Sequence, residues 1–307
     1  MSGLDDLEAA RARSGPSRIA ALRDAAEALG DELRATPIRS ARHVAIDRLV
    51  VRTRSVIPDA HLISPLIALG RRALLLVTAD DRRILVDPSD AGACTPYEER
   101  MASRHPVAMR AVSALRDPDV EWPDVDLVVS SSLVHRSLVR TRARLRGVRW
   151  IAPYEEIEAA RTPSTFDLPR YARTQVELEP VDGSKMIAPG VAMIDTPGPS
   201  AGHASIAFAL GGKVYVHSHA GVVVDAWSPY ESSIPGLREA VRLRGVEAVI
   251  RGDASDPIAS IETMAIERAL ADRRDDEPAL FRVLPGMEAV PVPFMPFLRP
   301  RASTIDG

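Results

Sequence analysis

A short polar turn and a pair of histidines stand at the ends of three consecutive apolar segments in the middle of the sequence. The turn, residues 196–203, reads Thr-Pro-Gly-Pro-Ser-Ala-Gly-His and joins the apolar runs 191–195 and 204–210. The third run ends in His217 and His219, whose spacing of two directs both imidazoles to one face of an extended strand. Imidazole is both an acid–base group near neutral pH and a metal ligand. The pattern therefore predicts a site built on strand ends.

The elements that position this site fall into two groups, each of strands followed by helices. Apolar runs bounded by turn residues predict the first strands at 45–51, 62–69, 73–78, 83–86, 125–130 and 148–151, with a turn at 70–72. The later predicted strands are 175–178, 185–188, the three central runs and 246–250. Helices are predicted at 97–115, from 137, and at 154–160, 235–244 and 257–271. Two such groups predict two β-sheets face to face with helices outside.

The composition of the 307 residues excludes several classes of protein. Apolar residues make up 46% of the chain and support a large core, while 4% aromatic residues leave aliphatic side chains to fill it. The net charge of −3 argues against a general nucleic-acid binder, and the single cysteine, Cys94, excludes an internal disulfide. No apolar run is long enough for a membrane span, and the N-terminus lacks a signal-peptide pattern. We expect a soluble, cytoplasmic protein that binds neither nucleic acid nor membrane.

Three regions are expected along the chain. Residues 1–40 form an N-terminal helical extension, in which apolar residues recur at three- and four-residue spacing. Residues 41–277 contain all of the predicted strands and form the main domain. Residues 278–307 are rich in proline, which is incompatible with regular helix, so we expect an extended tail packed on the body. The same tail is a candidate arm for joining two subunits in a homodimer.

Four places in the main domain resemble the metallo-β-lactamase superfamily. Ile84–Pro88 looks like that family's early strand ending in aspartate, and Val125–Ser130 like the strand that enters its His-x-His-x-Asp-His motif. Thr196–His203 is close to its Thr-Pro-Gly-His-x-x-Gly-His turn, and Lys213–His219 resembles the strand that delivers its bridging aspartate. The resemblance spans residues 44–270. It implies a four-layer αββα sandwich of two mixed β-sheets and hydrolysis at a metal centre.

The family's metal-ligand positions hold other residue types in this chain. The positions of the His-x-His-x-Asp-His motif are occupied by Ser131, Leu133, His135 and Arg136. Pro199 replaces the first histidine of the glycine turn, while His203 matches a histidine that is usually not a ligand. His219 stands at or beside the place of the bridging aspartate, and Asp253 stands near that of the final ligand histidine.

Under one interpretation, the resemblance implies a rebuilt centre in which His135, His219 and Asp253 bind one divalent metal. Two imidazoles and one carboxylate suit zinc, iron or manganese and leave positions open for water. Water bound to such a metal loses its proton near neutral pH. The chain would then hydrolyse an ester, lactone, thioester or amide, with Asp253 or His217 as the catalytic base.

Under the opposite interpretation, the centre has lost its metal and binds no cofactor. Arg136 would then supply the positive charge in place of the ion, because a guanidinium stays charged at all relevant pH values. Leu133 cannot ligate, and Pro199 removes an imidazole. The protein would be a non-catalytic pseudoenzyme that binds a small anion or a protein partner. In both interpretations Arg136, His203 and Ser131 are expected to contact a small-molecule ligand.

The remaining polar residues favour structural roles. His43, His61 and His105 are isolated in the sequence, which is typical of surface or hydrogen-bonded histidines. Asp87, at the end of a strand, is expected to bind backbone N–H groups at the edge of a sheet. The arginines within 136–149 lack interleaved aromatic residues and are typical of a solvated helix face.

Overall fold

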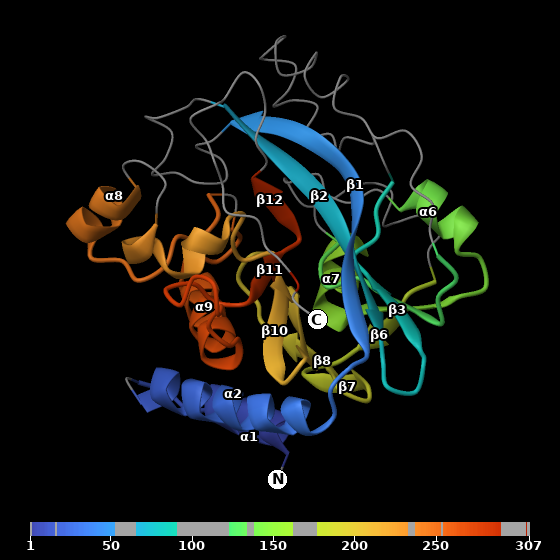
Figure 1. Cartoon of the computed structure of the whole chain (residues 1–307), viewed down its shortest axis with the longest axis horizontal. Coiled ribbons are helices and arrows are strands. Elements are labelled where there is room, and N and C mark those ends of the chain that lie inside the picture. The colour runs from blue at the N-terminus through green and yellow to red at the C-terminus, as the bar shows by residue number, and fades with distance from the viewer. Residues whose placement is uncertain are drawn as a thin grey trace.

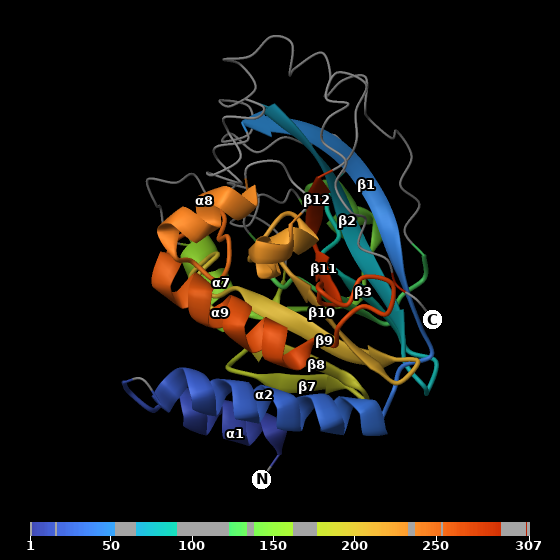
Figure 2. The same cartoon turned by 60° about the vertical axis from the view of Figure 1, so that its left-hand side comes forward.

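The computed structural model describes residues 2–15, 17–52, 66–90, 123–133, 138–161, 177–232, 237–252, 254–289 and 305 of the chain. Its strands form two mixed β-sheets that face each other, with helices against the outer face of each sheet (Figures 1 and 2). The four-layer αββα sandwich is therefore confirmed. No helix among the described residues is both long and apolar enough to cross a membrane.

The first sheet contains seven of the described strands. Its order is β1 (Ser40–Arg52), β2 (Leu66–Val77), β3 (Arg83–Val86), β4 (Leu127–Val129), β5 (Arg149–Pro153) and β6 (Glu179–Val181), while β12 (Met287–Ala289) pairs with β2. The β1, β2 and β3 strands are antiparallel, whereas β3, β4, β5 and β6 run parallel. Because β3 and β4 are parallel neighbours, the residues that follow them emerge at the same edge of the sheet.

The second sheet is mainly antiparallel. Its order is β11 (Val283–Pro285), β10 (Lys213–Ser218), β9 (Ala204–Leu210), β8 (Val191–Asp195) and β7 (Lys185–Ala188). Because β9 is covered on both faces, all seven of its residues are buried and nearly all are apolar. Ile206 and Phe208 face the first sheet, whereas Ala207 and Ala209 face the helices.

The helices cover the two outer faces. The second sheet packs against α1 (Gly3–Arg11), α2 (Ser17–Ala35) and α9 (Pro257–Leu270), and Figure 2 shows α1 and α2 side by side beneath it. The short elements η3 (Val224–Trp227), η4 (Pro229–Glu231) and α8 (Leu237–Arg244) extend this layer. The first sheet packs against α6 (Val139–Arg144) and α7 (Tyr154–Arg161). The predicted cap of α9 is confirmed, since the Asp256 carboxylate accepts hydrogen bonds from the N–H groups of Ile258 and Ala259.

Two predicted local structures are wrong for reasons of strand pairing. Residues 70–72 form no turn, because this part of β2 pairs with β1 on one side and with β12 on the other. Residues 246–250 form no strand, since the N–H of Val249 bonds to the carbonyl of Ala226. The sheet edge beside β10 is instead occupied by β11.

Residues 283–289, which lie in the predicted tail, belong to both sheets. The β11 strand runs parallel to β10 in the second sheet, and β12 runs antiparallel to β2 in the first. Gly286 is the residue between them, and its N–H and carbonyl bond to Ser218 and Arg72, respectively. The chain thus crosses from one sheet to the other in a single residue, next to the end of β10. Residues 290–304 lie outside the described part of the chain.

Candidate metal centre

Asp87 directly follows β3 and is held by residues that follow β4. Its backbone has a positive φ of 56°, a conformation that aspartate tolerates better than most residues, and its N–H bonds to the Val129 carbonyl at 2.7 Å. The backbone N–H of Ser131 donates to Oδ1 at 2.8 Å, and the Ser131 hydroxyl donates to Oδ2 at 2.5 Å. The predicted contact of Asp87 with backbone N–H groups is confirmed. These bonds also fix the orientation of its second oxygen.

That second oxygen meets two imidazoles from the other sheet. The Nε2 atoms of His217 and His219 each lie 2.8 Å from Asp87 Oδ2. The ring centroids are 5.4 Å apart and the ring planes are nearly perpendicular, at 87°. His217 lies on the face of β10 that points to the first sheet, and all three side chains are buried. The expectation that both histidines point to one side is confirmed.

These three side chains fit the donor set of a catalytic metal centre. One ligand atom from each of Asp87, His217 and His219 lies within 4.8 Å of the others, the one such group among the described residues. Two imidazoles and a carboxylate are common ligands of zinc and non-haem iron. Tetrahedral ligand atoms with metal bonds of 2.0–2.1 Å are about 3.3 Å apart. The observed 2.8 Å separations are therefore about half an ångström too short, a small movement for side chains.

His203 hydrogen-bonds to the backbone of His219 behind this group. Its Nε2 accepts the backbone N–H of His219 at 3.1 Å, and its Nδ1 lies 2.8 Å from the Thr196 carbonyl. Because Nε2 accepts, the proton is on Nδ1, which donates to Thr196. Burial lowers the pKa of His203 to about 4, so the ring is neutral near pH 7. Both ring nitrogens are engaged, and a substrate hydrogen bond to this ring requires that one of these bonds be exchanged.

Glu156, a residue of α7, ties the Ser131 loop to the glycine turn. Its carboxylate accepts the N–H groups of Leu133 and Gly202, at 2.8 and 3.2 Å, and the hydroxyl of Ser200. Burial raises the pKa of this carboxyl group. A Cβ on Gly202 would lie 2.3 Å from the Glu156 backbone nitrogen, so glycine is needed for this approach. The sequence analysis missed Glu156, since nothing in the order of residues 154–160 distinguishes it.

His43, which was expected to be a surface or hydrogen-bonded histidine, is partly buried in the structure. It lies on β1 opposite Leu74, and both of its ring nitrogens are buried without a hydrogen-bond partner among the described residues. Burial lowers the pKa of His43 to about 3, with smaller contributions from the charges of Arg72 and His217. His217 Nδ1 is likewise buried and without a described partner. Among the described residues, His43 and His217 thus have buried ring nitrogens with no hydrogen-bond partner.

The structure brings some of the predicted site residues together and does not describe others. Ser131, His217 and His219 meet at Asp87, with His203 directly behind them. His135, Arg136 and Asp253 lie outside the described residues, so their predicted roles as ligands, base and anion-binding group stay predictions. His61 and His105 also lie outside the described residues. Two members of the candidate ligand group were not proposed as ligands from the sequence: Asp87, whose position after a strand in Ile84–Pro88 was the available signal, and His217, which was expected to be the catalytic base.

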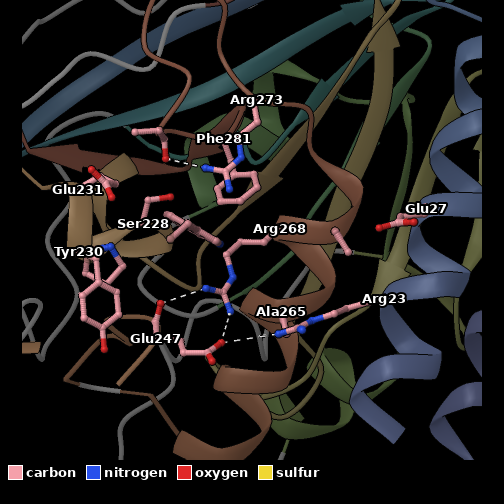
Figure 3. A pocket seen from close by; sticks show the side chains of 14 residues that line it. Arg23, Glu27, Ser228, Tyr230, Glu231, Glu247, Ala265, Arg268, Arg273 and Phe281 are labelled. Carbon is pink, nitrogen blue, oxygen red and sulfur yellow. Dashed lines mark hydrogen bonds and ion pairs between the residues drawn. The ribbon is translucent and has the colours of Figure 1, made fainter. Parts of the chain in front are cut away.

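A separate groove of about 650 Å³ lies in the helical layer of the second sheet, and its lining includes no member of the three-residue group (Figure 3). Figure 3 shows Arg23 and Arg268 pointing toward Glu247, whose carboxylate they approach to 3.6 and 3.3 Å. Arg273 stacks over Phe281, with its guanidinium carbon 3.9 Å from the ring centre. The lining also includes Glu27 and Glu231, so arginine and glutamate charges balance. This groove has no excess charge to select an ionic ligand.

No protein-family model and no curated protein sequence matches the chain. Solved structures do match its fold. A probable metal-dependent hydrolase from Staphylococcus aureus is 13% identical, with 73% of this chain and 82% of that chain covered at a TM-score of 0.52. An N-acyl homoserine lactone hydrolase, with N-hexanoyl-L-homoserine bound at its catalytic metal center, is 17% identical, with coverages of 74% and 86% and a TM-score of 0.50. A hydrolase of the beta lactamase superfamily is 14% identical, with coverages of 82% and 89% and a TM-score of 0.50. The chain has the metallo-β-lactamase fold, as the resemblance predicted.

Proposed function

We propose that this chain is a metal-dependent hydrolase in which Asp87, His217 and His219 hold one divalent ion. The observation that carries the proposal is the convergence of two imidazole nitrogens on one buried carboxylate oxygen between the two sheets. A bound zinc, iron or manganese ion would polarise a carbonyl group and lower the pKa of a coordinated water molecule. The reaction that we propose is hydrolysis of an ester, lactone, thioester or amide.

The chain's own residues have separate tasks in this proposal. Ser131 holds Asp87 through two hydrogen bonds, so that the free side of Oδ2 points to the histidines. The ring nitrogens of His43 and Nδ1 of His217 have no partner among the described residues, and we assign them to bind a polar atom of the substrate. His135 and Asp253 stay proposed as a further ligand and as the base, and Arg136 as a group that binds an anionic part of the substrate.

A non-catalytic binding protein is the second candidate, and one observation favours it. Asp87 lies at ordinary hydrogen-bond distance from both histidines, which stabilises the three side chains without an ion. The inherited pocket would then bind a small anion or a protein partner. The two candidates differ in whether a metal is needed.

A matched pair of aspartate variants separates the two candidates. Asp81 lies between β2 and β3 and Asp87 directly follows β3, and both have a positive φ, of 66° and 56°. Asparagine tolerates this conformation, so Asp87→Asn and Asp81→Asn change the charge with little effect on the backbone. Asp81 is exposed and pairs with Arg39, away from the histidines. Elemental analysis and Zn²⁺ titration of the wild type and both variants measure the number of bound ions and their affinity.

The proposed hydrolase requires close to one bound ion in the wild type and in Asp81→Asn, and loss of that ion in Asp87→Asn. Hydrolysis of a panel of lactones, esters, thioesters and amides should follow the same order and stop on chelation. Lactones head the panel because one protein of this fold is an N-acyl homoserine lactone hydrolase. The proposal is wrong, and the binding protein is favoured, if the wild type binds no Zn²⁺, Fe²⁺ or Mn²⁺ and chelators do not change its stability.

A further inference from the structure

A continuous chain of hydrogen bonds leads from the backbone of His219 to Glu267, a buried residue of α9. The His219 N–H donates to His203 Nε2, and His203 Nδ1 lies 3.1 Å from the Thr196 hydroxyl. Thr196 Oγ1 lies 2.8 Å from Ser205 Oγ, and the Ser205 hydroxyl donates to Glu267 Oε1 at 2.6 Å. The hydrogen-bond chain passes from Thr196, directly after β8, through Ser205 in β9 and ends in the helical layer.

Its two ends fix the direction of the hydrogen bonds. A backbone amide can only donate, so His203 accepts at Nε2 and carries its proton on Nδ1, between the Thr196 carbonyl at 2.8 Å and the Thr196 hydroxyl at 3.1 Å. With Glu267 ionised, the Ser205 hydroxyl donates to its carboxylate and accepts from the Thr196 hydroxyl. The Thr196 hydroxyl also lies 3.3 Å from the Ile194 carbonyl, so the chain branches at Thr196.

A second branch reaches the same carboxylate from the other side of His219. Ser218 also hydrogen-bonds to Glu267 through its side chain, while its Oγ accepts the N–H of Ala220 at 3.0 Å. The residues on both sides of His219 are therefore connected to Glu267. Trp227 adds a third donor, from its indole Nε1 to Oε2 at 2.7 Å.

Glu267 is fully buried and is held by neutral donors. Burying a carboxylate is costly unless its lone pairs are satisfied, and here Ser205, Ser218 and Trp227 satisfy them. An apolar side chain in its place would leave the buried donors of Ser205, Ser218 and Trp227 without this acceptor. The carboxylate thus joins three buried donors next to the strand end that carries His219.

We propose that Glu267 is a positioning residue, which holds the backbone of residues 218–220 and thereby aims the His219 imidazole at Asp87. Only the expected effect on metal affinity rests on the proposed function. Partners behind the ligands of a metal typically change its affinity by 10- to 100-fold when they are removed. The hydrogen bonds to residues 218–220 exist whether or not a metal is bound.

The test compares Glu267→Gln with Glu262→Gln, a matched control on the same helix. Glutamine keeps the size of Glu267 but cannot accept all of its donors, whereas the partly exposed Glu262 forms an ion pair with Arg18. Ser205→Ala, which cuts one branch with a small change in volume, is the second variant. Co²⁺ titration with the visible spectrum measures ligand geometry and affinity, and hydrogen–deuterium exchange of the His219 amide measures the held backbone.

We expect Co²⁺ affinity to fall about 10-fold in Glu267→Gln, with an altered visible spectrum, and by a smaller factor in Ser205→Ala. The His219 amide should exchange about 10-fold faster in both variants, and Glu262→Gln should match the wild type. Lower thermal stability with unchanged His219 exchange, Co²⁺ affinity and spectrum overturns the inference, because Glu267 is then only structural. If the wild type binds no Co²⁺ but His219 exchange still rises in both variants, the proposed function fails and the positioning role stands.

Discussion

The backbone of Gly286 lies against the imidazole ring of His219. A Cβ at position 286 would be 1.9 Å from His219 Cε1 and 2.4 Å from Nε2, the atom that faces Asp87. Gly286 is also the point at which the chain crosses from β11 in one sheet to β12 in the other. Its own backbone bonds to Ser218 and Arg72, so it has little freedom to retreat. The position of His219 therefore depends on the absence of a side chain at residue 286.

Gly286→Ala is expected to displace the His219 ring and abolish stoichiometric metal binding while the protein still folds. A contact of 1.9 Å cannot be tolerated, and the ring has to rotate away from Asp87. Zn²⁺ titration of the folded variant, checked by circular dichroism, is the measurement. Gly30→Ala is the control, because a Cβ there meets no atom closer than 3.5 Å and alanine favours its helix α2. Metal affinity in Gly286→Ala equal to that of Gly30→Ala contradicts the assignment of His219 as a ligand.

Glu156→Ala is expected to lower the free energy of unfolding by roughly 3–5 kcal/mol. The substitution leaves the buried N–H groups of Leu133 and Gly202 without their acceptor and opens a cavity beside the glycine turn. Urea denaturation measures the change. Glu155→Ala, at the exposed neighbouring position of α7, should change stability by less than about 0.5 kcal/mol. Equal effects of the two variants would mean that the carboxylate does not hold the turn.

The buried carboxyl group of Glu267 predicts a characteristic pH dependence of stability. Burial raises its pKa from 4.5 to about 7, while the hydrogen bonds from Ser205, Ser218 and Trp227 and the charge of Arg268 offset only part of this rise. The folded protein therefore retains a proton that the unfolded chain releases between these values. The resulting stabilisation is complete below pH 4.5 and is lost as the pH rises through 7, by roughly 3 kcal/mol.

Glu267→Gln isolates this effect, because glutamine does not titrate. The difference in unfolding free energy between wild type and variant should fall by roughly that amount between pH 4 and pH 8. Other titrating groups cancel in the difference. A difference that stays constant over this range would place the pKa of Glu267 near its ordinary value.

His203 is expected to stay neutral, as the Nδ1–H tautomer, down to about pH 4. Burial lowers its pKa from 6.5 to about 4, so between these pH values the unfolded chain binds a proton that the folded protein does not bind. The contribution of His203 to stability is therefore complete above pH 6.5 and is lost as the pH falls toward 4. Nitrogen-15 NMR of the ring, assigned with His203→Asn, reads both the tautomer and the titration. A ring protonated at Nε2 at pH 7 would contradict the hydrogen bond from the His219 amide.

Local sequence patterns were sufficient where neighbouring residues determine the structure. The uninterrupted apolar run 204–210 predicted a strand buried on both faces, and Asp256 with Pro257 predicted the start of α9. The spacing of His217 and His219 predicted their shared side, because side chains alternate along a strand. The strand ends and the glycine turn also carried the resemblance that predicted the αββα sandwich.

The tertiary structure decided which distant groups these elements meet. Asp87 lies 130 positions before His217 in the chain, and only the facing of the two sheets brings its carboxylate between the imidazoles. Residues 70–72 remain extended because β1 and β12 satisfy their backbone from both sides, although glycine and two arginines are typical of a turn. The sequence by itself determined which segment forms a strand buried on both faces and that His217 and His219 point to the same side. The carboxylate partner and the role of Gly286 depend on contacts between residues far apart in the chain, which local periodicity does not encode.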